Sequence, residues 1–346
     1  MRRSSLDTCV IFLTRDRPVT ALSNLRQLAR GDTFKIVLDN SRRSNFGKSI
    51  RSLSRFSDVL YHGPRQQSVV MNAFARFGSS VPTFTAPLGA TYWNTGFVRN
   101  YALLLSEVIG FQKVLFVDDD VSVKDPKLLQ AAFRILEHVD FVGARIGGLA
   151  DQSIIGHIGL RQSDPELSEF VSGGFMGLRL GSVMEPFLNY YNEDWIWVLM
   201  HREASYAMTP AKVVHQTYHS LLRNGSNRAI RQEMGEMLLE GVWNAAPSRN
   251  FSLLTNEKAW IQVIADRVLW IEDIAKKCRQ QQDRIGIAIA TALLRHVSTI
   301  SPSLLTAIFE QYFAVLPEWR RILKAASRLA IPQKMKQSIG LETTFD

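Results

Sequence analysis

Apolar runs alternate with amphipathic stretches through the first half of the chain, and this pattern predicts an α/β sheet. Apolar runs typical of buried strands lie at 8–14, 34–38, 113–117 and 141–146, with a shorter one within 54–61. Helical spacing covers 19–29, where Pro18 suits the first turn, and also 97–109 and 126–138. Strands alternating with helices in this order predict a parallel sheet joined by right-handed crossovers.

After about residue 250 glycine almost disappears and the spacing becomes that of amphipathic helices. Helices are expected at 257–282, 284–297, 303–315 and 318–329, with prolines at 302, 317 and 332 between them or at their ends. We therefore expect an α/β domain over 1–250 and a helical domain over 251–346. The helical domain could form a homodimer interface, an acceptor platform or a partner site, or its apolar faces could pack internally.

The composition is that of an ordinary globular protein, with 46% hydrophobic and 21% charged residues in 346. No apolar stretch reaches the length of a membrane span. The short apolar run near the start is followed by the charged residues 15–17, which predicts an unexported, cytoplasmic protein. Cys9 and Cys278 offer neither a disulfide framework nor the spacing of a metal site.

Positive charge is concentrated between Ser41 and Asn100, where eight basic residues and one acid give +7 of the chain's net +9. Such a surface suits phosphorylated ligands, nucleic acid or anionic lipid headgroups, unless it serves only solubility. Nucleic acid is not favoured, because no nucleic-acid-binding motif accompanies these arginines. Peripheral contact with a membrane stays open.

Three consecutive carboxylates, Asp118, Asp119 and Asp120, follow the apolar run at 114–117. Open α/β sheets bind ligands at the carboxyl ends of their strands. Since side chains alternate along a strand, Asp118 and Asp120 are expected on one side, where a divalent cation carrying a phosphate would relieve their repulsion. The alternative is an acidic cap for the helix that opens at 124–126.

Four segments, at 11–18, 36–41, 96–100 and 116–120, together resemble the GT-A glycosyltransferases, close to glycosyltransferase family 2. The last segment matches the DxD motif of that family, and the resemblance spans about residues 8–220. It implies a mixed, mostly parallel sheet flanked by helices, and transfer of a sugar from a nucleoside diphosphate donor, with UDP or GDP favoured, to an unknown acceptor. The Gln-x-x-Arg-Trp motif of processive members does not occur, which argues against a polymer synthase.

The resemblance also implies roles for individual residues at the donor. Asp120 and Asp118 would bind Mn²⁺ or Mg²⁺, and the expected nucleotide-sugar contacts are Thr14, Arg15, Asp39, Arg99, Asn100, Asp118 and Asp119. Asp39 would accept from the ring N–H of uracil, thymine or guanine, unless it is only a turn residue. Arg99 at a helix start would favour an anion, unless it forms a surface salt bridge.

The acceptor is expected near residues 173–175 and 190–197. Inverting transfer needs a carboxylate to take the proton of the acceptor hydroxyl, and the pair Glu193-Asp194 resembles the family's acidic pair, with Asp194 as base and Glu193 in reserve. Acceptor contacts are expected from Gly173, Gly174, Phe175 and Trp195. The alternatives are a plain tight turn, aromatic rings that belong to the core, and acids that cap a helix beginning at Trp195. Retention instead of inversion stays open.

His215 and His219 are four residues apart, a spacing that places both on one face of a helix. In many GT-A enzymes a downstream histidine completes the metal site. His215 is preferred because it follows the apolar residues 211–214 of a predicted strand, and mixed carboxylate and imidazole ligands suit Mn²⁺ at least as well as Mg²⁺. A structural histidine is the alternative.

Two other functions stay open. An apolar strand followed by Asp-x-Asp also opens the haloacid dehalogenase fold, a phosphohydrolase fold in which the first aspartate is a nucleophile, although there the motif lies near the start of the domain. A non-catalytic binder of acidic polymers or membranes would use the basic stretch, and its binding would be salt-sensitive and independent of metal.

Overall fold

The computed structural model describes residues 7–28, 33–41, 59–63, 67, 95–125, 127–148, 153–160, 171–181, 185–201, 203–215 and 225–328. Within them eight strands form one sheet in the order β3-β2-β1-β4-β7-β6-β8-β5. The strands are β1 (Thr8–Thr14), β2 (Phe34–Asp39), β3 (Val59–His62), β4 (Lys113–Asp118), β5 (Val121–Ser122), β6 (Phe141–Gly148), β7 (Phe175–Arg179) and β8 (Tyr206–His215). Strands β3, β2, β1 and β4 are mutually parallel, whereas β7 is antiparallel to both of its neighbours.

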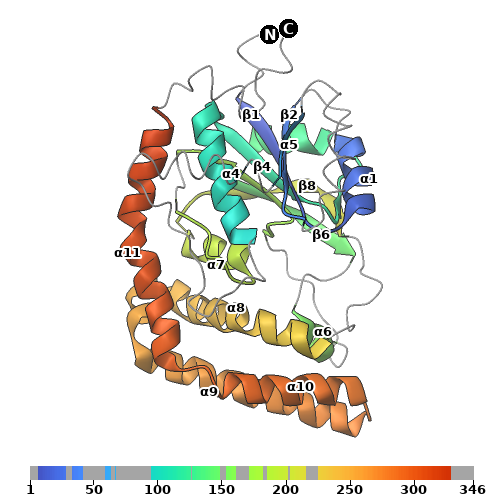
Figure 1. Cartoon of the computed structure of the whole chain (residues 1–346), viewed down its shortest axis with the longest axis vertical. Coiled ribbons are helices and arrows are strands. Elements are labelled where there is room, and N and C mark those ends of the chain that lie inside the picture. Colours follow the sequence, from blue (N-terminus) through green and yellow to red (C-terminus); the bar gives the residue numbers. More distant parts are fainter. Residues whose placement is uncertain are drawn as a thin grey trace.

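Helices cover both faces of this sheet (Figure 1). Those beside the sheet are α1 (Pro18–Leu28), α4 (Thr95–Ile109), α5 (Lys127–Ile135) and α7 (Glu193–Met200). Side chains alternate along each strand, so Ile11 and Phe116 pack in the core shared with α4, whereas Val10 and Phe12 pack in the opposite core shared with α1 and α5. The predicted class, a mixed sheet flanked by helices with a C-terminal helical region, is confirmed.

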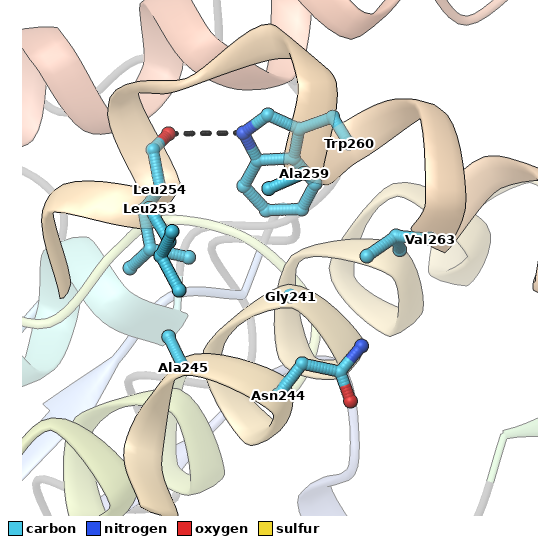
Figure 2. Close-up of a pocket in the computed structure, with 8 residues that line it drawn as sticks. All are labelled: Gly241, Asn244, Ala245, Leu253, Leu254, Ala259, Trp260 and Val263. Atoms are coloured by element: carbon cyan, nitrogen blue, oxygen red, sulfur yellow. Dashed lines mark hydrogen bonds between the residues drawn. The ribbon is translucent and has the colours of Figure 1, made fainter. Parts of the chain in front are cut away.

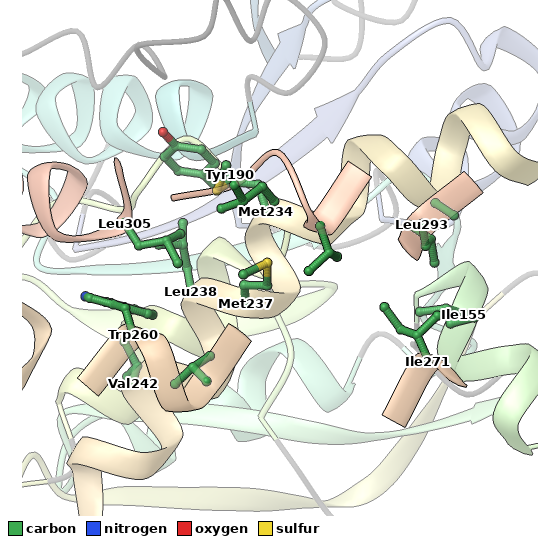
Figure 3. Close-up of a cluster of buried hydrophobic side chains, with 14 of the residues drawn as sticks. Ile155, Tyr190, Met234, Met237, Leu238, Val242, Trp260, Ile271, Leu293 and Leu305 are labelled. Atoms are coloured by element: carbon green, nitrogen blue, oxygen red, sulfur yellow. The ribbon is translucent and has the colours of Figure 1, made fainter. Parts of the chain in front are cut away.

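A separate helical layer lies beyond α7 (Figure 1). It contains α6 (Ile154–Leu160), α8 (Gly225–Ala245), α9 (Glu257–Gln280), α10 (Arg284–Val297) and the first half of α11 (Pro302–Ala326), with 3-10 turns at Ala246–Ser248 and Phe251–Thr255. Figure 3 shows its core, to which Ile155 contributes from α6, Met237 from α8, Trp260 from α9 and Leu293 from α10. Helices α6 and α8, which precede residue 250, therefore share one core with the helices that follow it.

Helix α11 is continuous, so the predicted break at Pro317 is wrong. Leu305 and Tyr312 in its first half pack in the helical core, and Trp319 and Leu323 in its second half pack in the sheet core with α4. A proline inside a helix costs about 3 kcal/mol. Burying Trp319, which is fully buried, and Leu323 stabilises the fold by about 1.5–3 kcal/mol for each side chain, enough to offset that cost.

Other element boundaries differ from the predicted ones by a few residues. Strand β3 lies at the end of its predicted window, α4 begins at Thr95, and α5 ends at Ile135 because the chain turns at 136–138. No single described helix combines the length and hydropathy of a membrane span. Helices α10 and α11 meet these criteria only as a pair, and they are bent by 75° at the break between them.

Candidate active site

The three carboxylates lie where β4 ends beside β1, in the middle of the sheet. Asp118 is the last residue of β4, opposite Leu13 of β1, and Asp119 and Asp120 form the turn into β5. Asp118 contacts Arg99, whereas Asp119 and Asp120 both contact Arg17. The strand ends at Asp118, so the alternation of side chains does not continue to Asp120. Asp118 and Asp120, which were expected on one side of a strand, therefore contact two different arginines.

Helix α5 has its own cap, which bears on the alternative interpretation of these acids. Asp125 Oδ1 accepts a hydrogen bond of 2.9 Å from the backbone N–H of Lys127, at the start of the helix. The cap predicted as an alternative role for residues 118–120 is therefore supplied by Asp125.

Arg99 links Asp118 to the start of α7. Its Nη2 lies 3.3 Å from Asp118 Oδ1, its Nε donates to Glu193 Oε1 at 3.2 Å, and its Nη1 donates to the carbonyl of Gly173 at 3.1 Å. The guanidinium also lies over the ring of Phe116, 5.2 Å from the ring centroid. Arg99 is 1% exposed, so it forms a buried ion pair network and not the surface salt bridge considered above.

Asp118 keeps more contact with solvent than the two acids that follow it. Its side chain is 30% exposed, against 6% for Asp119 and 9% for Asp120. Burial raises the pKa of Asp118 against the lowering effect of Arg99, and the neighbouring acids raise it further. Asp118 is thus the carboxylate best placed to meet a ligand.

The turn after β1 holds Asp119. Thr14 Oγ1 donates to Asp119 Oδ2 at 2.9 Å, the backbone N–H of Arg15 donates to the same oxygen at 3.2 Å, and Arg17 Nη1 lies 2.9 Å from Oδ1. Burial raises the pKa of Asp119 to about 6, although Arg17 and these hydrogen bonds oppose the shift. Thr14 and Arg15 were predicted to contact the nucleotide sugar, and that contact stays a prediction; Arg17 was not among the predicted site residues. Its position in a charged turn after the first strand was the only signal in the sequence.

Asp120 contacts both Arg17 and His215. His215 is the last residue of β8 and pairs with Val121 of β5, which brings its Nε2 within 3.5 Å of Asp120 Oδ1. Carboxylate and imidazole are suitable donors for Mn²⁺ or Mg²⁺, so these two residues fit part of a metal site. Within the described ranges no group of three or more His, Cys, Asp or Glu could hold a metal ion, and His219 lies outside the described residues.

Glu193 and Asp194 occupy the first turn of α7, where the helix dipole favours negative charge. The helix begins at Glu193, two residues before the predicted start, after Asn192 in a left-handed conformation with φ of 63°. Asp194 Oδ2 accepts from the backbone N–H of Gly173 at 2.5 Å. Glu193 is more deeply buried than Asp194, with 3% against 9% exposure, and is paired with Arg99.

The loop at Gly173 and Gly174 packs closely against other residues of the site. A Cβ atom at Gly173 would lie 2.4 Å from Arg99 Nη2 and 2.9 Å from Asp194 Cβ, so this position has no room for a side chain. The carbonyl of Gly174 accepts from the backbone N–H of Asp118 at 3.2 Å. Phe175 is fully buried in the core below α1 and α5, which corrects the prediction that it contacts an acceptor: it is the first residue of β7, and its side chain points into the sheet core.

Most of the aromatic rings near the acidic pair belong to the core. Tyr190, Tyr191 and Trp197 are at most 9% exposed, and Trp197 stacks on Phe187 with ring centroids 5.1 Å apart. The alternative interpretation of these three rings as core residues is therefore correct. Trp195 is only partly buried, so its contact with an acceptor stays a prediction.

Asp39 and Asn100 have partners within the protein. Asp39 Oδ1 accepts from the backbone N–H of Ser41 at 2.8 Å, as in a turn, and Oδ2 accepts from the Tyr61 hydroxyl at 2.7 Å. Each carboxylate oxygen has a second lone pair, so a nucleobase contact by Asp39 stays a prediction. Asn100 exchanges two hydrogen bonds with the backbone of Phe187, at 2.8 and 2.7 Å, which fixes the approach of the chain to α7.

A cavity of about 50 Å³ lies between α8 and α9, far smaller than the roughly 300 Å³ at which ligand pockets begin. Its lining is mostly apolar (Figure 2), and Trp260 Nε1 donates to the carbonyl of Leu254 at 2.9 Å beside it. None of its lining residues belongs to the candidate site.

The sequence matches no known protein-family profile and no curated protein sequence. The solved structures that are remotely similar in fold include the following two. A protein of Desulfovibrio desulfuricans G20, assigned as a nucleotide-diphospho-sugar transferase, is 11% identical, and the match covers 70% of this chain and 98% of that one with a TM-score of 0.35. Mouse xyloside xylosyltransferase 1, without ligand, is 12% identical over 55% and 72% of the two chains with a TM-score of 0.31. Similarities this remote carry no information about activity or substrate.

Proposed function

We propose that this protein is a metal-dependent, non-processive glycosyltransferase that moves a sugar from a nucleoside diphosphate donor to an acceptor hydroxyl with inversion. One observation carries the proposal. The open carboxylate Asp118, at the end of β4, lies beside Arg99, and the same arginine contacts Glu193 and the Gly173 loop that holds Asp194. Residues far apart in the sequence thus meet at the carboxyl ends of strands, where open α/β sheets bind ligands.

The donor side is supported by the turn 14–17 and the three acids. The turn lies against Asp119, so a nucleotide at the end of β1 would also lie beside Asp118. A divalent cation would be held by Asp120 and His215, and when bound it would neutralise the leaving diphosphate. UDP and GDP stay the favoured donors of this proposal. Asp39 at the end of β2 can accept from the ring N–H of uracil, thymine or guanine, whereas the cytosine ring of a nucleotide has no N–H to donate.

Asp194 is the proposed general base. It takes the proton of the acceptor hydroxyl as that oxygen bonds to the anomeric carbon and the nucleoside diphosphate departs. Asp194 is favoured over Glu193 because Arg99 already neutralises Glu193. The backbone N–H of Gly173 fixes the Asp194 carboxylate and leaves its second oxygen, Oδ1, for the acceptor.

Thermal unfolding against UDP-, GDP-, dTDP- and CMP-sugars, with and without Mn²⁺, tests the proposal. A ligand that binds only the folded state stabilises it by about 2.7 kcal/mol when present at a hundred times its Kd. We expect one nucleotide family to raise the Tm only with Mn²⁺, and Asp120→Asn to remove the shift. Asp273→Asn, an exposed acid on α9, is the matched control and should keep it.

Product analysis then separates the rival functions. Transfer to an acceptor supports the proposal, and Asp194→Asn should lower kcat by about 10²–10⁴ with little change in donor binding. Hydrolysis of simple phosphoesters with no response to any nucleotide sugar would instead favour a phosphohydrolase and overturn the transferase.

A further inference from the structure

Helix α9 carries apolar side chains on two sides, and one of these sides is exposed. Trp260 and Ile271 are buried in the helical core. Ile261 and Leu269 are instead 58% and 63% exposed. Helix α8 lies between α9 and the sheet (Figure 1), so α9 forms an outer edge of the molecule. Single exposed apolar residues are ordinary, whereas a row of them indicates a surface that binds a partner.

The exposed side of α9 is such a row. Its members are spaced by three, four, four and three residues, which aligns them along one side of the helix, and all of them are exposed: Lys258, Ile261, Ala265, Leu269 and Glu272. We call these five residues the α9 stripe. Ile264 and Val268, which are partly buried, border it on the side of the core.

The α9 stripe is symmetric about Ala265. Ile261 and Leu269 lie four residues to either side of Ala265, and Lys258 and Glu272 lie seven residues to either side. If a second α9 runs antiparallel to the first with the two alanines opposite each other, Ile261 of each copy meets Leu269 of the other, and each Lys258 meets a Glu272. A parallel arrangement would instead place lysine against lysine and glutamate against glutamate.

The two charged residues of the stripe lack ionic partners in the single chain. Lys258 lies in the first turn of α9, where the helix dipole disfavours a cation. Among the described residues neither Lys258 nor Glu272 forms an ion pair, not even Glu272 with Lys276 one turn further on, whereas the neighbouring Asp273 pairs with Lys277. An antiparallel second copy supplies each of the two with an opposite charge.

We propose that the α9 stripe is the contact surface of a homodimer, in which α9 of a second copy packs antiparallel about a two-fold axis at Ala265. This assigns a specific surface to the homodimer considered from the sequence, and it does not depend on the proposed function. An anionic membrane fits the stripe less well, because Glu272 would face the lipid phosphates.

The length of the stripe indicates how tightly the copies should bind. From residue 258 to residue 272 the helix rises about 21 Å. One such helix from each copy gives an interface at the lower end of the roughly 1,200–2,000 Å² of stable complexes, so we expect a Kd of about 1–100 µM.

Sedimentation velocity of the full chain over a range of concentrations that spans this Kd tests the dimer. Leu269→Gln should raise the Kd about a hundredfold, because the two-fold axis removes the leucine contact twice. Val19→Gln, which replaces an apolar residue of α1 that is 81% exposed, is the matched control and should keep the wild-type Kd.

Charge reversal tests the antiparallel register. Lys258→Glu should raise the Kd about tenfold, because it turns two attractive pairs into repulsive ones. It places an acid in the first turn of the helix, so the folded monomer should not lose stability. Adding Glu272→Lys to this variant should restore the wild-type Kd. Lys324→Glu, an equal change of charge at an exposed residue of α11, should leave the Kd unchanged.

A wild-type protein that stays monomeric throughout the concentration range overturns the proposal. So does a dimer whose Kd is unchanged in Leu269→Gln, or one that Val19→Gln weakens equally. An unchanged Kd in Lys258→Glu, or a double variant that stays weak, contradicts the antiparallel register. Flotation with phosphatidylserine vesicles covers the other occupant: a monomer that binds them, and loses this binding in Leu269→Gln, would assign the stripe to a membrane instead.

Discussion

Two buried arginines, Arg99 in the sheet domain and Arg267 in the helical layer, make similar contacts and have different consequences. Each side chain is 2% exposed, is bound by carboxylates and lies over an aromatic ring. Arg267 binds both oxygens of Glu233, at 2.6 and 3.0 Å, and its Nη1 lies 2.5 Å from Glu240. Burial and charge alone would rank the two arginines as equal candidates for a functional site.

The origin of the carboxylates separates them. Arg267 on α9 meets three glutamates, Glu233, Glu236 and Glu240, which follow one face of α8 and join two neighbouring helices. Arg99 instead joins the end of β4 to the start of α7. Exposure does not separate the clusters, because the Glu240 side chain is 37% exposed and that of Asp118 is 30% exposed. The position of the Arg99 cluster at a strand end, where open α/β sheets bind ligands, makes it the candidate site.

The two clusters are nevertheless connected. Glu236 accepts a hydrogen bond of 2.9 Å from Asn192 Nδ2, and Asn192 immediately precedes the acidic pair at 193–194. Gly235 has no room for a Cβ, which would lie 2.0 Å from the carbonyl oxygen of Tyr191. The helical layer thus supports the segment that delivers Asp194 to the site.

Removing either arginine should have the largest effect. Arg267→Met leaves the fully buried Glu233 without a counter-charge, and Arg99→Met does the same to Glu193, so each should lower the free energy of unfolding by about 3–5 kcal/mol. Urea denaturation measures both. Arg249→Gln breaks an exposed pair with Glu203 and should change stability by less than about 1 kcal/mol. A loss as small as that of Arg249→Gln in either buried variant would show that its network is not a stabilising one.

Adding one methyl group in each region should separate stability from ligand binding. The Cβ of Gly173→Ala would meet Arg99 at 2.4 Å, and that of Gly241→Ala would meet the Trp260 ring at 2.2 Å. Both should lose about 1–3 kcal/mol of stability by overpacking. Calorimetric titration with the donor found in the thermal screen should show weaker binding for Gly173→Ala alone. Equally weakened donor binding by Gly241→Ala would show that the helical layer also contributes to the donor site.

A further expected effect concerns pH and belongs to the Arg267 cluster. Burial raises the pKa of Glu240 from 4.5 to about 7, against the lowering effect of Arg267. The folded protein thus binds this proton more tightly than the unfolded chain, so stability contributed by the protonated form is lost as pH rises from about 4.5 to 7.

Glu240→Gln removes this proton-binding group. The variant should therefore lose less stability as the pH rises, and the difference should be at most the free energy linked to binding about one proton. Melting temperatures of the wild type and the variant between pH 4.5 and 8 measure it. Asp119, whose pKa is also raised, acts in the same direction and should persist in the variant. Parallel curves for the two proteins would contradict the raised pKa of Glu240.

Much of the fold could be predicted from local pattern. The apolar runs marked β1, β2, β4 and β6 because buried strands in a sheet need apolar residues on both faces. The helices α9 and α10 followed from their spacing. The break at Pro317 was predicted wrongly, because propensity is local whereas Trp319 and Leu323 gain their burial from α4, some 200 residues away in the chain.

The candidate site could be predicted only in part. The acids 118–120 and His215 could be selected as candidates because Asp118 and His215 end predicted strands and the other two acids follow directly. Arg17 was not, since an arginine in a turn has the same local pattern whether or not it meets two aspartates. Phe175 was misassigned because a glycine-rich neighbourhood does not reveal that the next residue begins β7.

The sequence by itself determined which residues are apolar, which carry charge and where strands and helices begin, because these depend on neighbours along the chain. Only the tertiary structure decided that Asp118 pairs with Arg99, that Asp119 and Asp120 share Arg17, and that Gly173 holds Asp194. These pairings join residues up to about a hundred positions apart. Their distances are set by strand order and by helix packing, which emerge only when the whole core has formed.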